Sequence, residues 1–531
     1  MKVTLPTGKW DRGAWLMALL SGFFLSSLIY SRFLFVDGVL LYTDVGSDSV
    51  NIIYPYLVHL SDYIRSEGIP SWSFSVGMGQ DLFYLAGSLV WQPVTWLPRD
   101  LIASALVYQH VIKTLLAGFL FCRFLQLRGL SWPASLLGSL LVSFSSYLCM
   151  GGCWVNLADE VVGFTAILLA AELALGRGRW WLLSLAVTLI GLISPFHLYL
   201  CALLLVCYVP ARLIAKQDRD AKVVMRRCAL LAGAACLGVG LGAMVTLPHL
   251  YAILNSPRGS GTVSTSSLLA SQSVFGLASG LQTVTAILRL LANDAIGTAN
   301  DFRGWGNYLE APLTYCGLIS LVLLPQAFLR ASWRQRMFYA LFLAGIVLST
   351  IFPWFRHLFW LFQGDYYRVL SLFSILGLIS LSMIAFSRYT EGRPLGLWLI
   401  AVTTFLLAAL PYLPLEAVQA RINPGLKLTI AFFLFSYGLL LIVGQLLGKQ
   451  KLAAFLVVGL TMIELVQFDR ITVTTRNTVT KSELTARVGY NDETVDAVRD
   501  IKASDSDKFY RITKLRPSGP SGLTSLNDAL V

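Results

Sequence analysis

The sequence predicts an all-α polytopic membrane protein. Only 13% of its 531 residues are charged and 56% are hydrophobic, whereas roughly 25% are charged in a typical soluble domain. Apolar runs long enough to cross about 30 Å of hydrocarbon as helices recur from Trp15 to Phe468. Helices satisfy their own backbone hydrogen bonds, as a segment in lipid must. A single soluble core does not explain this pattern, so lipid is expected to be the main solvent.

The apolar runs define about thirteen spans that alternate in direction. They are predicted at 13–35, 103–124, 133–150, 160–176, 180–194, 196–214, 228–252, 311–330, 337–353, 367–387, 394–412, 427–447 and 452–468. The first run is too long for the core of a signal peptide, so we expect it to remain as an anchor. The Ser194–Pro195 junction fits either a tight hairpin or a broken helix.

The net charge of +12 follows this topology. The basic residues cluster between spans, and with alternating spans every cluster falls on the side of the amino terminus. The positive-inside rule then places the amino terminus in the cytoplasm and the tail outside. Binding to nucleic acid is therefore not expected. The eight cysteines lie mainly in apolar spans without metal-ligand spacing and are interpreted as small core residues.

Three predicted outer segments are longer than a helix connection requires: Val36–Asp100, Leu254–Glu310 and the tail Asp469–Val531. In the first, Tyr54–Ile64 has an apolar face, which predicts an interfacial helix on the membrane surface. The tail is far more polar than the transmembrane part, residues 1–468, and Lys508–Ile512 is typical of a strand entering a soluble domain. Because about 60 residues make a marginal domain, we expect the chain to stop inside it.

The strongest polar cluster, Tyr42–Pro55, follows the first span and has Asp48 at its centre. A partly buried carboxylate can have its pKa raised toward the working pH and then accept a proton from an incoming hydroxyl. Alternatively, Asp44 and Asp48 merely cap the following helix, and spacing alone favours this interpretation. The segments Trp72–Asp81 and Trp91–Pro93 mix aromatic residues with glycines, which suits a sugar or a lipid headgroup but also an aromatic belt.

Charged residues near other spans are further candidates. Asp159 and Glu160 lie in a predicted outer loop, Cys153–Glu160, where they either share a cavity with Asp48 or begin a helix. Lys113 lies in the middle of the second span, where an ammonium is costly unless it faces a cavity or a partner. Arg258, Arg303 and Arg368 fall near the outer face and can bind a phosphate leaving group, but each also fits a snorkelling or salt-bridged residue. Asp365 is the expected alternative partner of Arg368, and His197 is a weaker candidate at a helix junction.

The sequence contains no phosphate-binding glycine motif of nucleotide enzymes, no H-E-x-x-H and no pair of CxxC motifs. Energy for a reaction must therefore arrive within the substrate. No cofactor is predicted, and a divalent metal is compatible with the residues but not indicated by them.

The order of the motifs resembles the bacterial YfhO-type membrane proteins, which belong among the GT-C glycosyltransferases that use polyprenyl-phosphate sugars. The likeness covers nearly the whole chain. It is carried by Asp48 with Pro55 seven residues later, Trp72–Ser73, Gly77–Met78–Gly79, Trp91–Gln92–Pro93, Lys113, Asp159, Ser256–Pro257–Arg258, Asn307–Tyr308, Tyr315–Cys316–Gly317 and Tyr367–Arg368. Two features depart from the family. Asn51 and Ile52 stand where glutamines are frequent, and the long outer domain is shortened.

The resemblance implies an inverting membrane glycosyltransferase in the bacterial cytoplasmic membrane. Its donor is a polyprenyl-phosphate sugar, and its acceptor is a glycan, polymer or protein outside the cytoplasm. Asp48 is the implied general base, with Asp159 as a second acidic group or a group that positions the acceptor. The implied contacts to substrate or phosphate are Lys113, Arg258, Arg303, Arg368, Asp44, Asn51, Tyr54 and His197. A transporter or flippase for a lipid-linked envelope precursor is the alternative, and an assembly scaffold is a third hypothesis.

Overall fold

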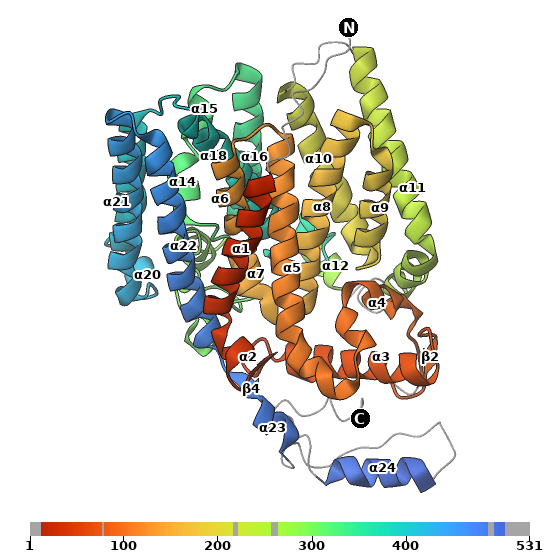
Figure 1. Ribbon diagram of the computed structural model, residues 1–531. Coiled ribbons are helices and arrows are strands. Elements are labelled where there is room, and N and C mark those ends of the chain that lie inside the picture. The colour runs from red at the N-terminus through yellow and green to blue at the C-terminus, as the bar shows by residue number, and fades with distance from the viewer. Residues whose placement is uncertain (1–11, 77–78, 216–220, 256–263, 487–492, 505–531) are drawn as a thin grey trace.

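Long, roughly parallel helices form a bundle in the computed structural model (Figure 1). The structure describes residues 12–76, 79–215, 221–255, 264–486 and 493–504. At the lower end of the bundle in Figure 1 lie α2, α3, α4 and β4, and we call this end the loop face. The polar residues of the candidate site come mainly from segments at the loop face or just inside the bundle.

Most helices of the bundle run between the loop face and the opposite end, and two short ones, α14 and α15, lie among them (Figure 1). They are α1 (Arg12–Ile29), α5 (Arg99–Leu127), α6 (Trp132–Ser143), α8 (Val155–Arg177), α9 (Trp180–Gly191), α10 (Pro195–Ala215), α11 (Ala221–Leu254), α14 (Leu318–Leu323), α15 (Gln326–Leu329), α16 (Trp333–Ile351), α18 (Arg368–Thr390), α19 (Leu397–Ala409), α21 (Pro424–Leu446) and α22 (Gln450–Thr474). Among the described residues, seven helical segments are long and apolar enough to cross a membrane, and α16 with the bent continuation α17 (Pro353–Phe359) makes an eighth. The all-α architecture is confirmed, whereas the number of thirteen spans stays a prediction.

One boundary decides between two alternatives that the sequence leaves open, and a second boundary differs from the sequence prediction. Residues Leu192–Ser194 separate α9 from α10, so the Ser194–Pro195 junction is a turn between two helices rather than a break within one. The expected outer loop Cys153–Glu160 is wrong, because α8 already begins at Val155 and includes both acidic residues. A buried partner for Asp159, described below, explains why the helix tolerates a carboxylate there.

The first large segment folds into short elements against the loop face. They are α2 (Ser31–Phe35), β1 (Gly38–Tyr42), η1 (Ser49–Ile53), α3 (Tyr54–Ser66), β2 (Trp72–Ser73), β3 (Gln80–Asp81), η2 (Phe83–Gly87), α4 (Ser88–Trp91) and η3 (Pro93–Trp96). The expected amphipathic helix is present as α3, whose buried residues include Leu57, Leu60 and Tyr63. Its position on a membrane surface stays a prediction.

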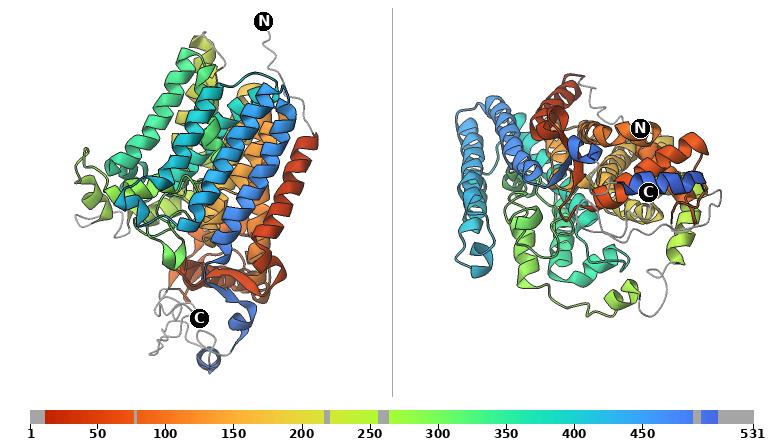
Figure 2. Two further views of the ribbon diagram at one scale, coloured as in Figure 1. Left: turned by 90° about the vertical axis from the view of Figure 1, so that its left-hand side faces the viewer. Right: turned by 90° about the horizontal axis from the view of Figure 1, so that it is seen from below.

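The segment after the last helix returns to the first loop. Strand β4 (Thr478–Thr480) pairs with β1 in antiparallel register, with Gly38 opposite Thr480 and Tyr42 opposite Thr478. Helix α23 (Lys481–Thr485) follows, and α24 (Thr494–Ser504) lies beneath α3 in Figures 1 and 2. The expected strand Lys508–Ile512 lies outside the described residues. The start of the tail therefore belongs to the loop face.

Short elements complete this end of the bundle. They are α7 (Ser146–Cys149), η4 (Gly151–Cys153), α12 (Thr265–Ala270), α13 (Gly280–Leu288), η5 (Ala299–Asp301), η6 (Leu410–Tyr412) and α20 (Glu416–Gln419). The turn formed by α7 and η4 is buried under the loops, so its backbone and side chains can contact residues from both ends of the chain.

Candidate functional site

Lys113 and Asp159 form a buried ion pair between α5 and α8. The Lys113 Nζ atom lies 2.5 Å from Asp159 Oδ1, and both side chains are almost fully buried. Gln92, between α4 and η3, donates to Asp159 Oδ2 at 2.5 Å and accepts from Lys113 Nζ at 3.1 Å. The partner that the depth of Lys113 requires is thus a carboxylate of the protein itself.

Glu160 and His197 form a second buried pair one residue further along α8. The His197 Nε2 atom lies 2.9 Å from Glu160 Oε1, and Ser194 Oγ lies 2.7 Å from His197 Nδ1. Tyr147, in α7, donates to the other Glu160 oxygen. The position of His197 at the start of α10 is therefore fixed by hydrogen bonds on both ring nitrogens.

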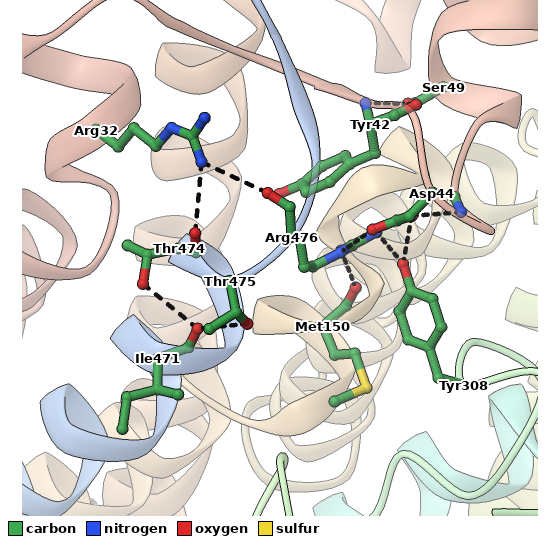
Figure 3. Close-up of polar contacts among 11 residues, drawn as sticks. Arg32, Tyr42, Asp44, Ser49, Met150, Tyr308, Ile471, Thr474, Thr475 and Arg476 are labelled. Atoms are coloured by element: carbon green, nitrogen blue, oxygen red, sulfur yellow. Dashed lines mark hydrogen bonds and ion pairs between the residues drawn. The ribbon is translucent and has the colours of Figure 1, made fainter. Parts of the chain in front are cut away.

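Asp44 belongs to a buried cluster that joins the first loop to the end of α22 (Figure 3). Its carboxylate receives Arg476 Nε at 3.1 Å and Nη2 at 3.2 Å, together with the Tyr308 hydroxyl at 2.8 Å. Arg476 also donates to the Met150 carbonyl at 3.0 Å and packs over the Tyr42 ring at 3.6 Å. Because this fork-shaped pair is fully enclosed, Asp44 is a structural anchor in this state rather than an exposed ligand.

Asp48 differs from Asp44 in being exposed on the loop face. It directly precedes η1 and makes no side-chain capping hydrogen bond there, so the capping alternative is not what the structure shows for this residue. Asn51 is buried within η1, and Tyr54 is half-buried at the start of α3. Burial raises the pKa of Tyr54, and Arg99 and Asp100 at the start of α5 lie within its electrostatic range.

Arg368, the first residue of α18, faces Glu310 instead of the expected partner Asp365. The Arg368 Nη2 atom lies 3.7 Å from Glu310 Oε1, and both side chains are partly exposed. Asp365 pairs with Arg356 of α17, whose Nε lies 2.5 Å from its carboxylate. The expectation of an Arg368–Asp365 bridge is wrong because residues 361–367 are not helical, so the three-residue spacing does not align the two side chains.

Asp48 belongs to the surroundings of Arg368 through Glu310. Burial raises the pKa of Glu310, Arg368 lowers it, and the nearby charges of Asp48 and Asp365 raise it. Glu310 therefore lies within electrostatic range of both Arg368 and Asp48. We call these three residues the Arg368 site.

The guanidinium of Arg368 is surrounded by aromatic rings and has unused donors. Its carbon lies 4.6 Å from the Trp154 ring centre, 4.5 Å from that of Tyr366 and 5.8 Å from that of Trp360. The Nε atom of Arg368 and the indole nitrogens of Trp154 and Trp360 are buried without a hydrogen-bond partner among the described residues. Buried donors are normally paired, so these three donors are available to a water molecule or to a ligand that carries acceptor atoms. Indole and guanidinium nitrogens only donate, which makes an oxyanion a fitting ligand.

Two further predicted residues, Arg303 and Arg258, are not placed in the Arg368 site by the structure. Arg303 is exposed between η5 and α14, and its backbone N–H donates to the Ile296 carbonyl at 2.9 Å. Arg258 lies outside the described residues. In the part of the chain that the structure describes, no group of three or more His, Cys, Asp or Glu side chains is placed to hold a metal ion.

Four residues of these contacts are not marked by the sequence: Glu310, Trp154, Trp360 and Arg476. Arg476 follows the last span and had no local pattern to mark it. In the sequence, Glu310 marks only the end of the second large segment, although an acidic residue at the predicted entry to a span is a signal. The two tryptophans are indistinguishable by sequence from the residues of an aromatic belt.

The fold and the site define a class: a polytopic helical membrane protein with an arginine-centred polar site at one end of its bundle. The family model "Bacterial membrane protein YfhO" matches residues 19–531, so the chain belongs to the YfhO family. A comparison with curated proteins gave no match.

Two crystal structures of ArnT from Cupriavidus metallidurans are similar to the chain at 14% sequence identity. The one bound to undecaprenyl phosphate has a TM-score of 0.47, and the apo structure has a TM-score of 0.45. In both comparisons the match covers 98% of this chain and 84% of the ArnT chain.

Proposed function

We propose that the protein transfers a sugar from a polyprenyl-phosphate carrier to an acceptor hydroxyl, with inversion at the anomeric carbon. The observation that carries this proposal is the Arg368 site. There an arginine with unpaired neighbouring donors lies beside the partly exposed carboxylate of Glu310. A departing phosphate requires preorganised positive charge and hydrogen-bond donors. An attacking hydroxyl requires a base within reach, and Asp48 is the exposed carboxylate of this environment.

The reaction is a single displacement. The acceptor oxygen forms a bond to the anomeric carbon while the bond from that carbon to the phosphate oxygen breaks. The hydroxyl proton passes to Asp48, and polyprenyl phosphate leaves with the electron pair. Arg368 binds the phosphate oxygens as their charge increases, and Arg258, Arg303, Asn51 and Tyr54 are further candidate contacts.

Lys113, Asp159 and His197 have a different proposed role. Each is buried and already paired within the protein, so they position the first loop and the start of α8 rather than bind substrate directly. This role also accounts for Lys113 at bilayer depth without a transport path. The proposal places the bound phosphate on the same side of the membrane as the acceptor.

Carrier binding provides the first test. Purified protein in detergent is titrated with polyprenyl monophosphate and binding is followed by intrinsic tryptophan fluorescence, because Trp154 and Trp360 flank Arg368. We expect Arg368→Ala to weaken binding by about tenfold to a hundredfold, the range for a lost charged hydrogen bond. Arg65→Ala, which removes an exposed arginine of α3, is the matched control and should bind normally. Equal affinity in wild type and Arg368→Ala would overturn the phosphate site.

A further inference from the structure

Glu310 is held beside Arg368 by the backbone and not by a strong contact between the two side chains. The Tyr367 N–H donates to the Glu310 carbonyl at 3.0 Å, and the Glu310 N–H donates to Asn307 Oδ1 at 3.0 Å. These bonds hold Glu310 next to Arg368 independently of any contact between the two side chains. The 3.7 Å separation of the charged groups is longer than a hydrogen bond, so their attraction is weak and reversible.

The charges around Glu310 are unbalanced. Asp48 and Asp365 both lie within electrostatic range of Glu310, and Asp365 is already paired with Arg356. Arg368 is the cation that faces Glu310 and also the residue whose surroundings contain the unpaired donors. A phosphate entering this place adds negative charge next to Asp48 and Glu310. Like charges at such distances repel, so an ionised Glu310 opposes phosphate binding.

We propose that Glu310 competes with the phosphate of the lipid carrier for Arg368, so that the carboxylate holds the guanidinium in the unloaded protein and releases it when phosphate binds. The inference rests on the proposed function because it assigns Arg368 to the carrier phosphate. Glu310 is then a positioning residue that keeps Arg368 oriented. It also limits how tightly the protein retains the product, polyprenyl phosphate.

The competition predicts that removing a negative charge improves ligand binding. Glu310→Gln keeps the size of the side chain and should tighten polyprenyl monophosphate binding by about two- to fivefold, the range of a partly exposed ion pair. Glu67→Gln is the matched control, because it removes one exposed carboxylate at the end of α3 that is not among the charges facing Glu310. That variant should bind like wild type. Glu310→Ala serves as a second variant if the glutamine protein has a lower melting temperature.

A double variant separates competition from a general charge effect. In an Arg368→Ala background, Glu310→Gln should give a smaller gain than in wild type, because the group for which the two ligands compete is absent and only the direct repulsion is relieved. With the carrier kept below its dissociation constant, inorganic phosphate should displace it at lower concentration in Glu310→Gln than in wild type if the phosphate group alone is recognised. Displacement by polyprenyl alcohol and not by inorganic phosphate would instead assign the binding to the lipid and overturn the inference.

The outcomes distinguish this inference from the proposed function. Weaker or unchanged binding in both Glu310 variants, with binding still lost in Arg368→Ala, would overturn the competition and leave the phosphate site standing. A gain in the Arg368→Ala background as large as the gain in wild type would also overturn it. If wild-type protein does not bind polyprenyl monophosphate, both the inference and the proposed function fail.

Discussion

Lys113 Nζ and Asp159 Oδ1 lie 2.5 Å apart in the interior of the bundle, where α5 and α8 meet. This contact joins two helices of the bundle. Gln92, at the end of the first loop, bonds to both residues and so joins the loop to them. Removing one partner of such a buried ion pair is strongly destabilising, because the other partner is left as an uncompensated charge in the interior.

Substituting one partner is therefore expected to cost more than substituting both. Lys113→Met leaves a buried carboxylate without its cation, and the expected loss is about 3–5 kcal/mol of stability. The double variant Lys113→Met/Asp159→Leu should recover most of this loss. Thermal unfolding of the three proteins in one detergent measures the effect. If the double variant is no more stable than Lys113→Met, the two residues do not act as a pair.

The Asp44–Arg476 pair makes a prediction about the first loop. Arg476→Lys keeps the charge but loses the fork that contacts both carboxylate oxygens. We expect faster proteolysis between β1 and α3 and a lower melting temperature, with little change within the helical bundle. Arg470→Lys, at an exposed position in α22 shortly before Arg476, is the control. Equal cleavage of the Arg476 and Arg470 variants would contradict the anchoring role of Asp44.

Acid stability tests the pairing of Asp365. Burial by itself raises the pKa of Asp365, but contacts with His357 and Arg356 outweigh it and lower the pKa below its ordinary value. A carboxyl whose pKa is lower in the folded state contributes stability above its unfolded pKa, and this contribution is lost as pH falls through the folded pKa. The melting temperatures of wild type and Asp365→Asn should therefore differ most near neutral pH and converge below about pH 4. A difference that does not change with pH would contradict the pairing.

Arg368→Lys tests whether the forked shape of the guanidinium matters. Lysine keeps the charge but presents a single ammonium, so we expect carrier binding to fall by about tenfold while the melting temperature changes little. Asp365→Asn should alter stability without altering carrier binding, because Asp365 pairs with Arg356 and not with Arg368. Isothermal titration with polyprenyl monophosphate and a thermal scan on the same samples separate the two effects. Full binding by Arg368→Lys would mean that only the charge is recognised.

Local patterns in the sequence predicted the helical bundle, the amphipathic α3 and the need of Lys113 for a partner. They misplaced the start of α8, because a carboxylate next to an apolar run was assigned to a loop when its neutralising lysine lay in another helix. Arg476 contacts Asp44 across 432 positions, and such a pairing leaves no trace in residue spacing. Residue spacing does not reveal Glu310 for the same reason, because its proximity to Arg368 follows from backbone pairing between two irregular segments.

Sugar transfer by purified protein tests the central claim most directly. The protein is supplied with a polyprenyl-phosphate sugar carrying a radiolabel and with membranes from cells that lack this protein as the source of acceptor. Wild-type protein should move the label to an acceptor, and Asp48→Asn should reduce the rate by about 10²- to 10⁴-fold, the contribution of a general base, while carrier binding is retained. Asp62→Asn, an exposed aspartate of α3, should transfer like wild type. Transfer that is undiminished in Asp48→Asn would contradict the account.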